Sequence, residues 1–62
     1  MLDQNIVQML NLFASQQQSD YILHWLKLQE SGERIALSNH PDASPALKHA
    51  ITELLSKHPE LK

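Results

Sequence analysis

Histidine is the residue type with the widest chemical range in this chain, since a neutral imidazole can bind a metal ion or take up a proton near neutral pH. Three of the four histidines, His40, His49 and His58, follow one another at intervals of nine residues. Nine residues make about two and a half helical turns, so successive histidines would lie on opposite faces of a helix. Zinc ligands need a spacing that brings them together. We therefore expect no metal site, and we assign His40 and His58 to helix ends, where the helix dipole favours a positive imidazole.

Covalent catalysis is not indicated by the other reactive side chains. It requires a serine, cysteine or lysine activated by an oriented base, together with backbone donors that a glycine-rich turn supplies. The chain has no cysteine and a single glycine, and its serines fall in capping or loop contexts. A glycine-rich phosphate-binding loop is also missing from the sequence. We expect no catalytic residues, no cofactor and no enzymatic activity.

Nucleic-acid binding is an alternative that the middle of the chain raises. A helix from residue 19, the turn at Gly32 and a short segment over residues 33–39 could be arranged as a helix-turn-helix motif. The charges do not favour it, because five Lys and Arg residues are scattered among seven Asp and Glu residues and the net charge is −2. The second helix would open with Glu33 and offer only Arg34 and Asn39 to base edges. A dimeric regulator of helix-turn-helix type is therefore the alternative function, and nucleic acid is the less favoured partner.

The composition is typical of one small globular domain. The chain has 62 residues, of which 42% are apolar, and no Gly/Ser-rich or Pro-rich linker, so we expect a single domain over residues 1–62. The lack of cysteine excludes a disulfide framework and fits a reducing compartment. No basic leader with an apolar run opens the sequence, and no apolar run has the length of a membrane span. We expect a complete cytoplasmic protein with no membrane contact.

The spacing of apolar residues predicts helices over most of the chain. Over residues 2–14 they recur at steps of three and four, which is the helical period, and Asp3 or Asn5 can cap the first turn. A second helix is expected over residues 19–30, with Ser19 as its N-cap. The polar residues between the two helices include no glycine or proline, so the end of the first helix is not marked in the sequence.

Two further helical segments complete the expected fold. Gly32 suits the left-handed position that follows a helix, and residues 33–38 can form two short turns that end before Pro41. The last helix has the clearest start, with Ser44 as N-cap and Pro45 at the first helical position. Its apolar face is formed by Leu47, Ala50, Ile51, Leu54, Leu55 and His58. The sequence thus predicts an all-α fold, a small bundle of three main helices plus a short helical turn.

A β-hairpin is the competing interpretation of the middle segment. Residues 24–29 and 34–38 contain alternating apolar and polar residues, as half-buried strands do. With Ser31 and Gly32 as the turn, the apolar residues of both strands would share one face. This would give an α+β fold, a helix, a hairpin and a helix. The composition favours helices, because leucines far outnumber β-branched residues.

The apolar surface exceeds what one short chain readily covers. A chain of this length buries only about 60% of the surface that it exposes when unfolded. The helix expected over residues 19–30 is apolar around most of its circumference and needs neighbours on several sides. We therefore expect a homodimer that completes the bundle. The residues expected at its interface are Ile6, Met9, Leu10, Phe13, Tyr21, Ile22, Trp25, Leu26 and Leu28.

These expectations point to binding as the function. Large aromatic side chains dominate the energetics of protein interfaces, so Trp25 and Tyr21 are the strongest candidates for association. We expect a non-enzymatic protein–protein interaction module that acts as a homodimer, as a small regulator, adaptor or inhibitor. Its expected partners are a second copy of the chain and another protein.

Overall fold

The structure, a computed structural model, describes residues 3–61, which form four α-helices and a final 3₁₀ turn with no strand. The elements are α1 (Gln4–Ser15), α2 (Ser19–Leu28), α3 (Ser31–Ser38), α4 (Pro45–Lys57) and the 3₁₀ turn η1 (Pro59–Leu61). The prediction of an all-α fold is confirmed for this part of the chain. The hairpin alternative is wrong, because residues 24–28 belong to α2 and residues 34–38 to α3.

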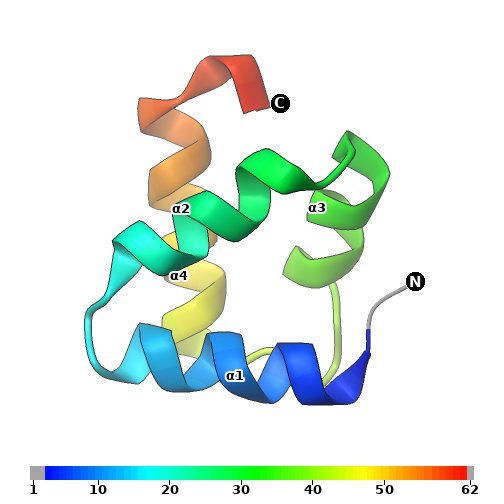
Figure 1. The fold of residues 1–62 in the computed structure, drawn as a ribbon, viewed down its shortest axis with the longest axis vertical. Helices are drawn as coiled ribbons and strands as arrows, with labels where there is room; N and C mark the ends of the chain where they lie inside the picture. The colour runs from blue at the N-terminus through cyan, green and yellow to red at the C-terminus, as the bar shows by residue number, and fades with distance from the viewer. Residues whose placement is uncertain (1–2, 62) are drawn as a thin grey trace.

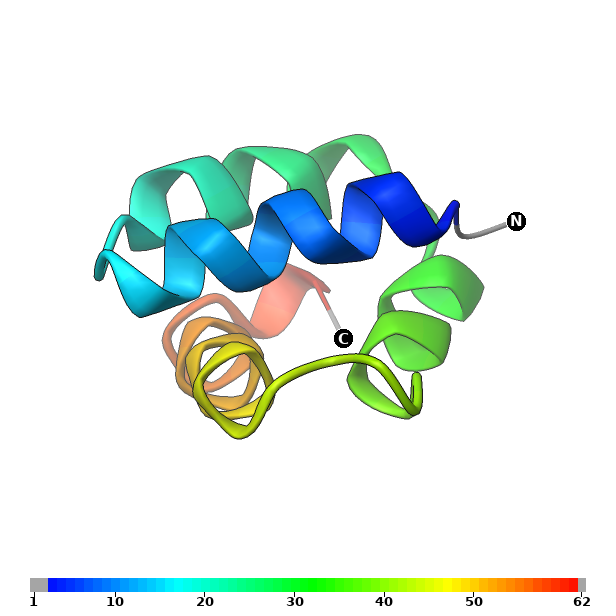
Figure 2. The ribbon, with the colours of Figure 1, turned by 90° about the horizontal axis from the view of Figure 1, so that it is seen from below.

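The helices are arranged in two layers. Helices α1 and α2 lie side by side and antiparallel at the front of Figure 1, and α3 and α4 lie behind them. Figure 2 shows the two layers edge on, with α4 running across the α1 and α2 pair. Helix α4 contacts each of the other three α-helices and η1, so it is the centre of the fold.

One copy of the chain closes a core between these layers. The buried apolar residues come from every element: Val7, Leu10, Ile22, Leu26, Leu37, Ala43, Leu47, Ile51, Leu54 and Leu61. The accessible surface is 4182 Å², against roughly 4100 Å² expected for a folded monomer of this mass. The single chain is therefore as compact as a monomeric domain of its size.

Polar side chains fix the ends of the helices. The Asp3 carboxylate accepts a hydrogen bond from the Asn5 amide (3.0 Å), and the Ser44 hydroxyl accepts one from the Leu47 amide (3.1 Å). The predicted caps at Asp3 and Ser44 are confirmed. The Asn11 side chain joins α1 to the loop before α4, because it donates to the Asp42 carbonyl and accepts from the Ser44 amide, each at 2.9 Å.

The turn between α1 and α2 contains the one left-handed residue among residues 3–61. Gln17 has a φ of 58°. The Gln18 amide donates to the Phe13 carbonyl (2.9 Å) and the Gln17 amide to the Ala14 carbonyl (3.1 Å), which is the Schellman pattern that ends a helix. The expectation for Gly32 is wrong: it lies inside α3 without a positive φ. The expectation for Ser19 is also wrong: it is the first residue of α2, and the N-cap is Gln18, which makes no side-chain capping bond.

Substitution of Gln17 by glycine should stabilise the protein. A non-glycine residue in the left-handed region costs roughly 1–2 kcal/mol, which outweighs the roughly 0.4–1 kcal/mol that a more flexible unfolded chain costs. We expect Gln17→Gly to raise the free energy of unfolding by about 0.5–1 kcal/mol, measured by urea denaturation. Gln16→Gly, at a position with a φ of −95°, is the control and should not stabilise. Equal shifts in both variants would contradict the assignment of strain to Gln17.

Candidate functional site

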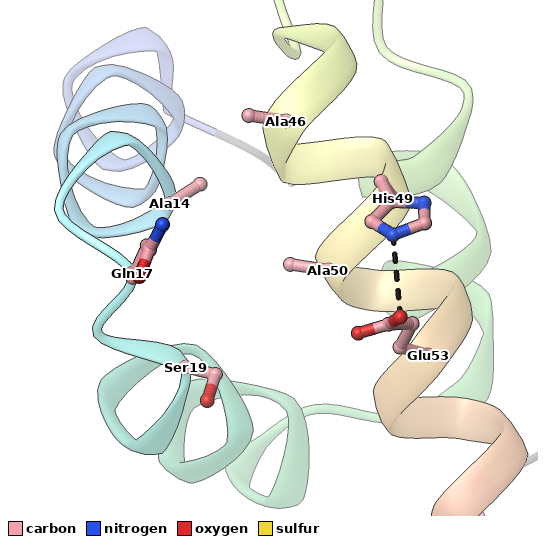
Figure 3. A pocket seen from close by; sticks show the side chains of 7 residues that line it. All are labelled: Ala14, Gln17, Ser19, Ala46, His49, Ala50 and Glu53. Atoms are coloured by element: carbon pink, nitrogen blue, oxygen red, sulfur yellow. Dashed lines mark ion pairs between the residues drawn. The ribbon is translucent and has the colours of Figure 1, made fainter.

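A shallow recess of about 340 Å³ lies where the turn between α1 and α2 meets α4 (Figure 3). Its lining residues are Ala14, Gln17, Ser19, Ala46, His49, Ala50 and Glu53. Four of the lining residues, Ala14, Ser19, Ala46 and Ala50, have small side chains, so the recess is open to solvent. The polar groups in it are an amide, a hydroxyl and one histidine–carboxylate pair.

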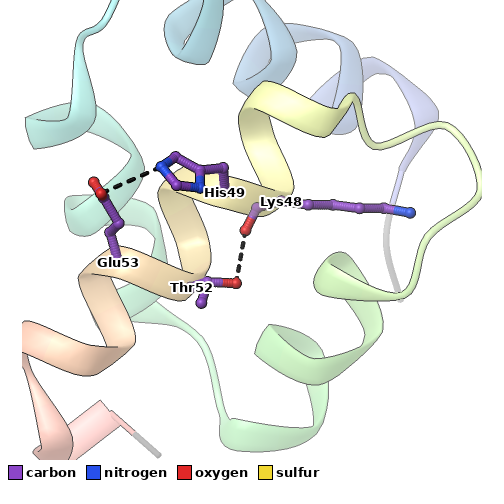
Figure 4. Close-up of polar contacts among 4 residues, drawn as sticks. All are labelled: Lys48, His49, Thr52 and Glu53. Atoms are coloured by element: carbon purple, nitrogen blue, oxygen red, sulfur yellow. Dashed lines mark hydrogen bonds and ion pairs between the residues drawn. The ribbon is translucent and has the colours of Figure 1, made fainter.

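The histidine–carboxylate pair lies on the solvent side of α4. His49 Nε2 is 3.2 Å from Glu53 Oε1, and the two side chains are 75% and 58% exposed (Figure 4). One helical turn separates them, and so exposed a pair contributes only about 0.3–0.5 kcal/mol. In Figure 3, Ser19 lies across the recess from His49. The hydroxyl and the imidazole are thus not the adjacent nucleophile and base that acyl transfer requires.

Metal binding has no geometric support among the residues that the structure describes. No three His, Asp or Glu side chains of residues 3–61 are close enough to hold a metal ion. His58 is next to η1, and its Nδ1 is 3.3 Å from Glu60 Oε1. A backbone hydrogen bond at Glu60, assisted by this contact, lowers the pKa of the Glu60 carboxyl from its ordinary value. The pair therefore belongs to the end of the fold and not to a ligand site.

The two helices considered for base recognition are joined by only Gln29 and Glu30. Arg34, the basic residue of α3, points back into the protein. Its Nε donates to the Leu26 carbonyl and its Nη1 to the Leu61 carbonyl, each at 2.7 Å. Both hydrogen bonds are charge-assisted and therefore strong. They hold the guanidinium against the chain's own backbone. The geometry gives α3 no free arginine with which to read a base.

The nine residues expected at an interface fall into three groups that differ in the exposed fraction of their side chains. The fully buried ones, which have no side-chain surface left for a partner, are Leu10, Ile22 and Leu26. Those that are half-buried and pack against the core are Ile6, Phe13 and Trp25. The exposed ones are Met9 (45%), Tyr21 (57%) and Leu28 (68%).

The exposed apolar residues of α1 and α2 gather on the side of these helices that is turned away from α4. Helical periodicity places Met9 and Leu12 on that side of α1, and Tyr21 and Leu28 on that side of α2. This side is toward the viewer in Figure 1. The rings of Phe13 and Tyr21 stack with centroids 4.9 Å apart and planes 20° apart, which ties the two helices together. We call this surface the α1–α2 face and define it as Met9, Leu12, Phe13, Tyr21, Trp25 and Leu28.

Leu12 belongs to this surface but was not among the expected interface residues. The apolar stripe of α1 is wide, and the sequence does not indicate which edge of it meets α4. The structure leaves Leu12 54% exposed. A further exposed apolar residue, Ile35 at 60%, lies on α3 in the other layer.

Comparison with protein-family models, with curated proteins and with solved structures found no match. No helix within residues 3–61 combines the length and the apolarity needed to cross a bilayer. The geometry of the chain itself is therefore the basis on which its function is inferred.

Proposed function

We propose that this protein is a small non-enzymatic protein-interaction module, a regulator, adaptor or inhibitor, which binds protein chains through the α1–α2 face. One observation carries the proposal. Met9, Leu12, Tyr21 and Leu28 are 45–68% exposed, although the same chain encloses seven side chains that are almost fully buried. A concentrated apolar patch on a small soluble domain marks a site of association.

The chemistry of the face supports a protein as the ligand. Aromatic side chains and methionine are enriched at protein interfaces, and tyrosine and tryptophan combine a large apolar area with a polar group. The stacking of Phe13 on Tyr21 restricts both rings before any partner binds. Because less side-chain freedom is then lost on association, the face is prepared for binding.

The other candidate sites support their functions less well. The recess beside α4 is open, and its only charged pair is largely exposed. The helix-turn-helix alternative needs free basic groups on α3, while the Arg34 guanidinium is bound to two backbone carbonyls. The α1–α2 face is therefore the surface on which the function is best tested.

Site-specific photo-cross-linking in the cells that make this protein tests the proposal. A photoreactive amino acid at Leu28 should give a discrete, heavier product whose second protein is identified by mass spectrometry. The same amino acid at Ile35 is the control, because Ile35 is comparably exposed, 60% against 68%, but lies on α3. Products from both positions, or from neither, would contradict an interaction function for this face.

A further inference from the structure

We propose that the chain which covers the α1–α2 face is a second copy of this protein. This inference rests on the proposed interaction function and names its partner. The two α1 helices would pack antiparallel across a two-fold axis that passes near Met9, in the middle of α1.

Helix α1 carries no charged residue, and none occurs anywhere between Asp3 and Asp20. Its exposed positions hold only amides, a hydroxyl and apolar groups: Gln4, Asn5, Gln8, Met9, Leu12 and Ser15. Helix surfaces that face water are normally rich in charged residues. The centre of a protein interface is depleted in charged residues and enriched in methionine and aromatic residues.

A neutral face is complementary to a copy of itself. In a two-fold dimer the same patch meets on both subunits, so a charge that lies beside the axis approaches its own copy. Like charges brought together in this way cost several kcal/mol. The α1 surface avoids that cost because α1 carries no charged residue. A charged partner would find no counter-charge on α1.

The charges of α2 favour the antiparallel arrangement. Asp20 is in the first turn of α2 and Lys27 in the last, and both are exposed. When α2 runs antiparallel to α2 of the second copy, Asp20 of one chain approaches Lys27 of the other. A parallel arrangement would instead place identical charges at the same end. The opposite signs at the two ends of α2 therefore select the direction of pairing.

A stable dimer would use most of one broad side of the molecule. A specific interface buries about 800 Å² on each partner, roughly a fifth of the 4182 Å² of this chain. Only a broad side of a molecule with extents of 25 × 24 × 17 Å can supply that area. Of the two broad sides, the one formed by α1 and α2, seen in Figure 1, carries four of the five exposed large apolar side chains of residues 3–61.

Sedimentation equilibrium on the purified full-length chain is the direct test, and the mass expected at micromolar concentration is twice that of one chain. Met9→Glu should weaken association about 100-fold, because it places two carboxylates beside the two-fold axis. Ile35→Glu makes the same kind of change on α3 and should leave the dissociation constant unchanged. A circular-dichroism spectrum with the helix content of the parent chain shows that each variant folds.

A charge-swap experiment separates a second copy from any other occupant. Met9→Lys alone should be as weakly associated as Met9→Glu, while an equimolar mixture of the two variants should recover the dimer. Only a face that pairs with itself gives this rescue. A mass of one chain at all concentrations, or variants whose mixture remains monomeric, overturns the second copy as partner. That failure is distinct from failure of the proposed function, which cross-linking at Leu28 to a different protein would still support.

Discussion

Replacement of Leu26 by alanine should cost about 2–5 kcal/mol of folding free energy, while the same replacement at Leu28 should cost less than about 0.5 kcal/mol. The two leucines are two positions apart on α2, but Leu26 is fully buried and Leu28 is 68% exposed. Alanine at position 26 leaves a cavity among residues of the core. Urea denaturation at a concentration where the chain is monomeric measures both effects without a contribution from association.

The free energy lost in Leu26→Ala is large relative to the total stability of so short a chain. A domain of 62 residues is stable by about 3–9 kcal/mol in total, so Leu26→Ala can unfold the protein outright. Ile22→Val removes a single methyl group from another fully buried residue of α2 and should cost about 0.5–1.5 kcal/mol. If Leu26→Ala and Leu28→Ala were equally destabilising, the division between core and face described above would be wrong.

Helix identity could be predicted from the sequence because it depends on local signals. The start of α4 is an example, since Ser44 and Pro45 are the preferred residues for the N-cap and first position, and the Ser44 hydroxyl accepts the Leu47 amide as expected. The short helix α3 was also expected, although its alternation of apolar and polar residues fits a strand equally well. In the structure this segment is helical, Leu37 is buried in the core and α3 contacts α4.

The boundary between α1 and α2 could not be predicted, because its signal was missing from the sequence. A helix that ends in a Schellman motif usually has glycine at the left-handed position. Here that position is Gln17, and the one glycine of the chain, Gly32, lies inside α3. The expectation that Gly32 would be left-handed followed from the residue type alone.

The division of apolar residues between core and surface depends on tertiary packing. Leu10 and Met9 are neighbours on α1, yet Leu10 is fully buried and Met9 is 45% exposed. Helical period identifies a wide apolar stripe but not which part of it faces α4. The absence of charge along α1 is a sequence signal that could have added Leu12 to the apolar residues expected on the exposed side of this helix.

Arg34 is the clearest case in which long-range structure decides the role of a side chain. The sequence presents it as one of few residues able to contact a base. Its two partners are the Leu26 carbonyl, in the last turn of α2, and the Leu61 carbonyl, in η1. Carbonyls in the last turn of a helix lack intrahelical partners, and only the folded chain brings these two carbonyls to one guanidinium.

Replacement of Arg34 by methionine should therefore lower the free energy of unfolding by about 2–3 kcal/mol. Methionine keeps the apolar stem but removes the charged donor from both carbonyls, and a hydrogen bond to a charged group contributes about 1.5–3 kcal/mol. The expected total stays near the value for one such bond, since the Leu26 carbonyl also accepts from the Gln29 amide at 3.2 Å. Urea denaturation measures the loss, and Arg34→Lys, which keeps the charge but not the fork of donors, should lose about half as much.

The same change should also act locally on the end of the chain. The Leu61 amide donates to the His58 carbonyl at 2.9 Å within η1, and Arg34 holds the Leu61 carbonyl from the other side. Amide hydrogen exchange at Leu61 should accelerate more in Arg34→Met than exchange at Ile51 in the core, because the end of the chain is released before the fold opens. An unchanged exchange rate at Leu61 would show that Arg34 does not hold η1 against α2 and α3.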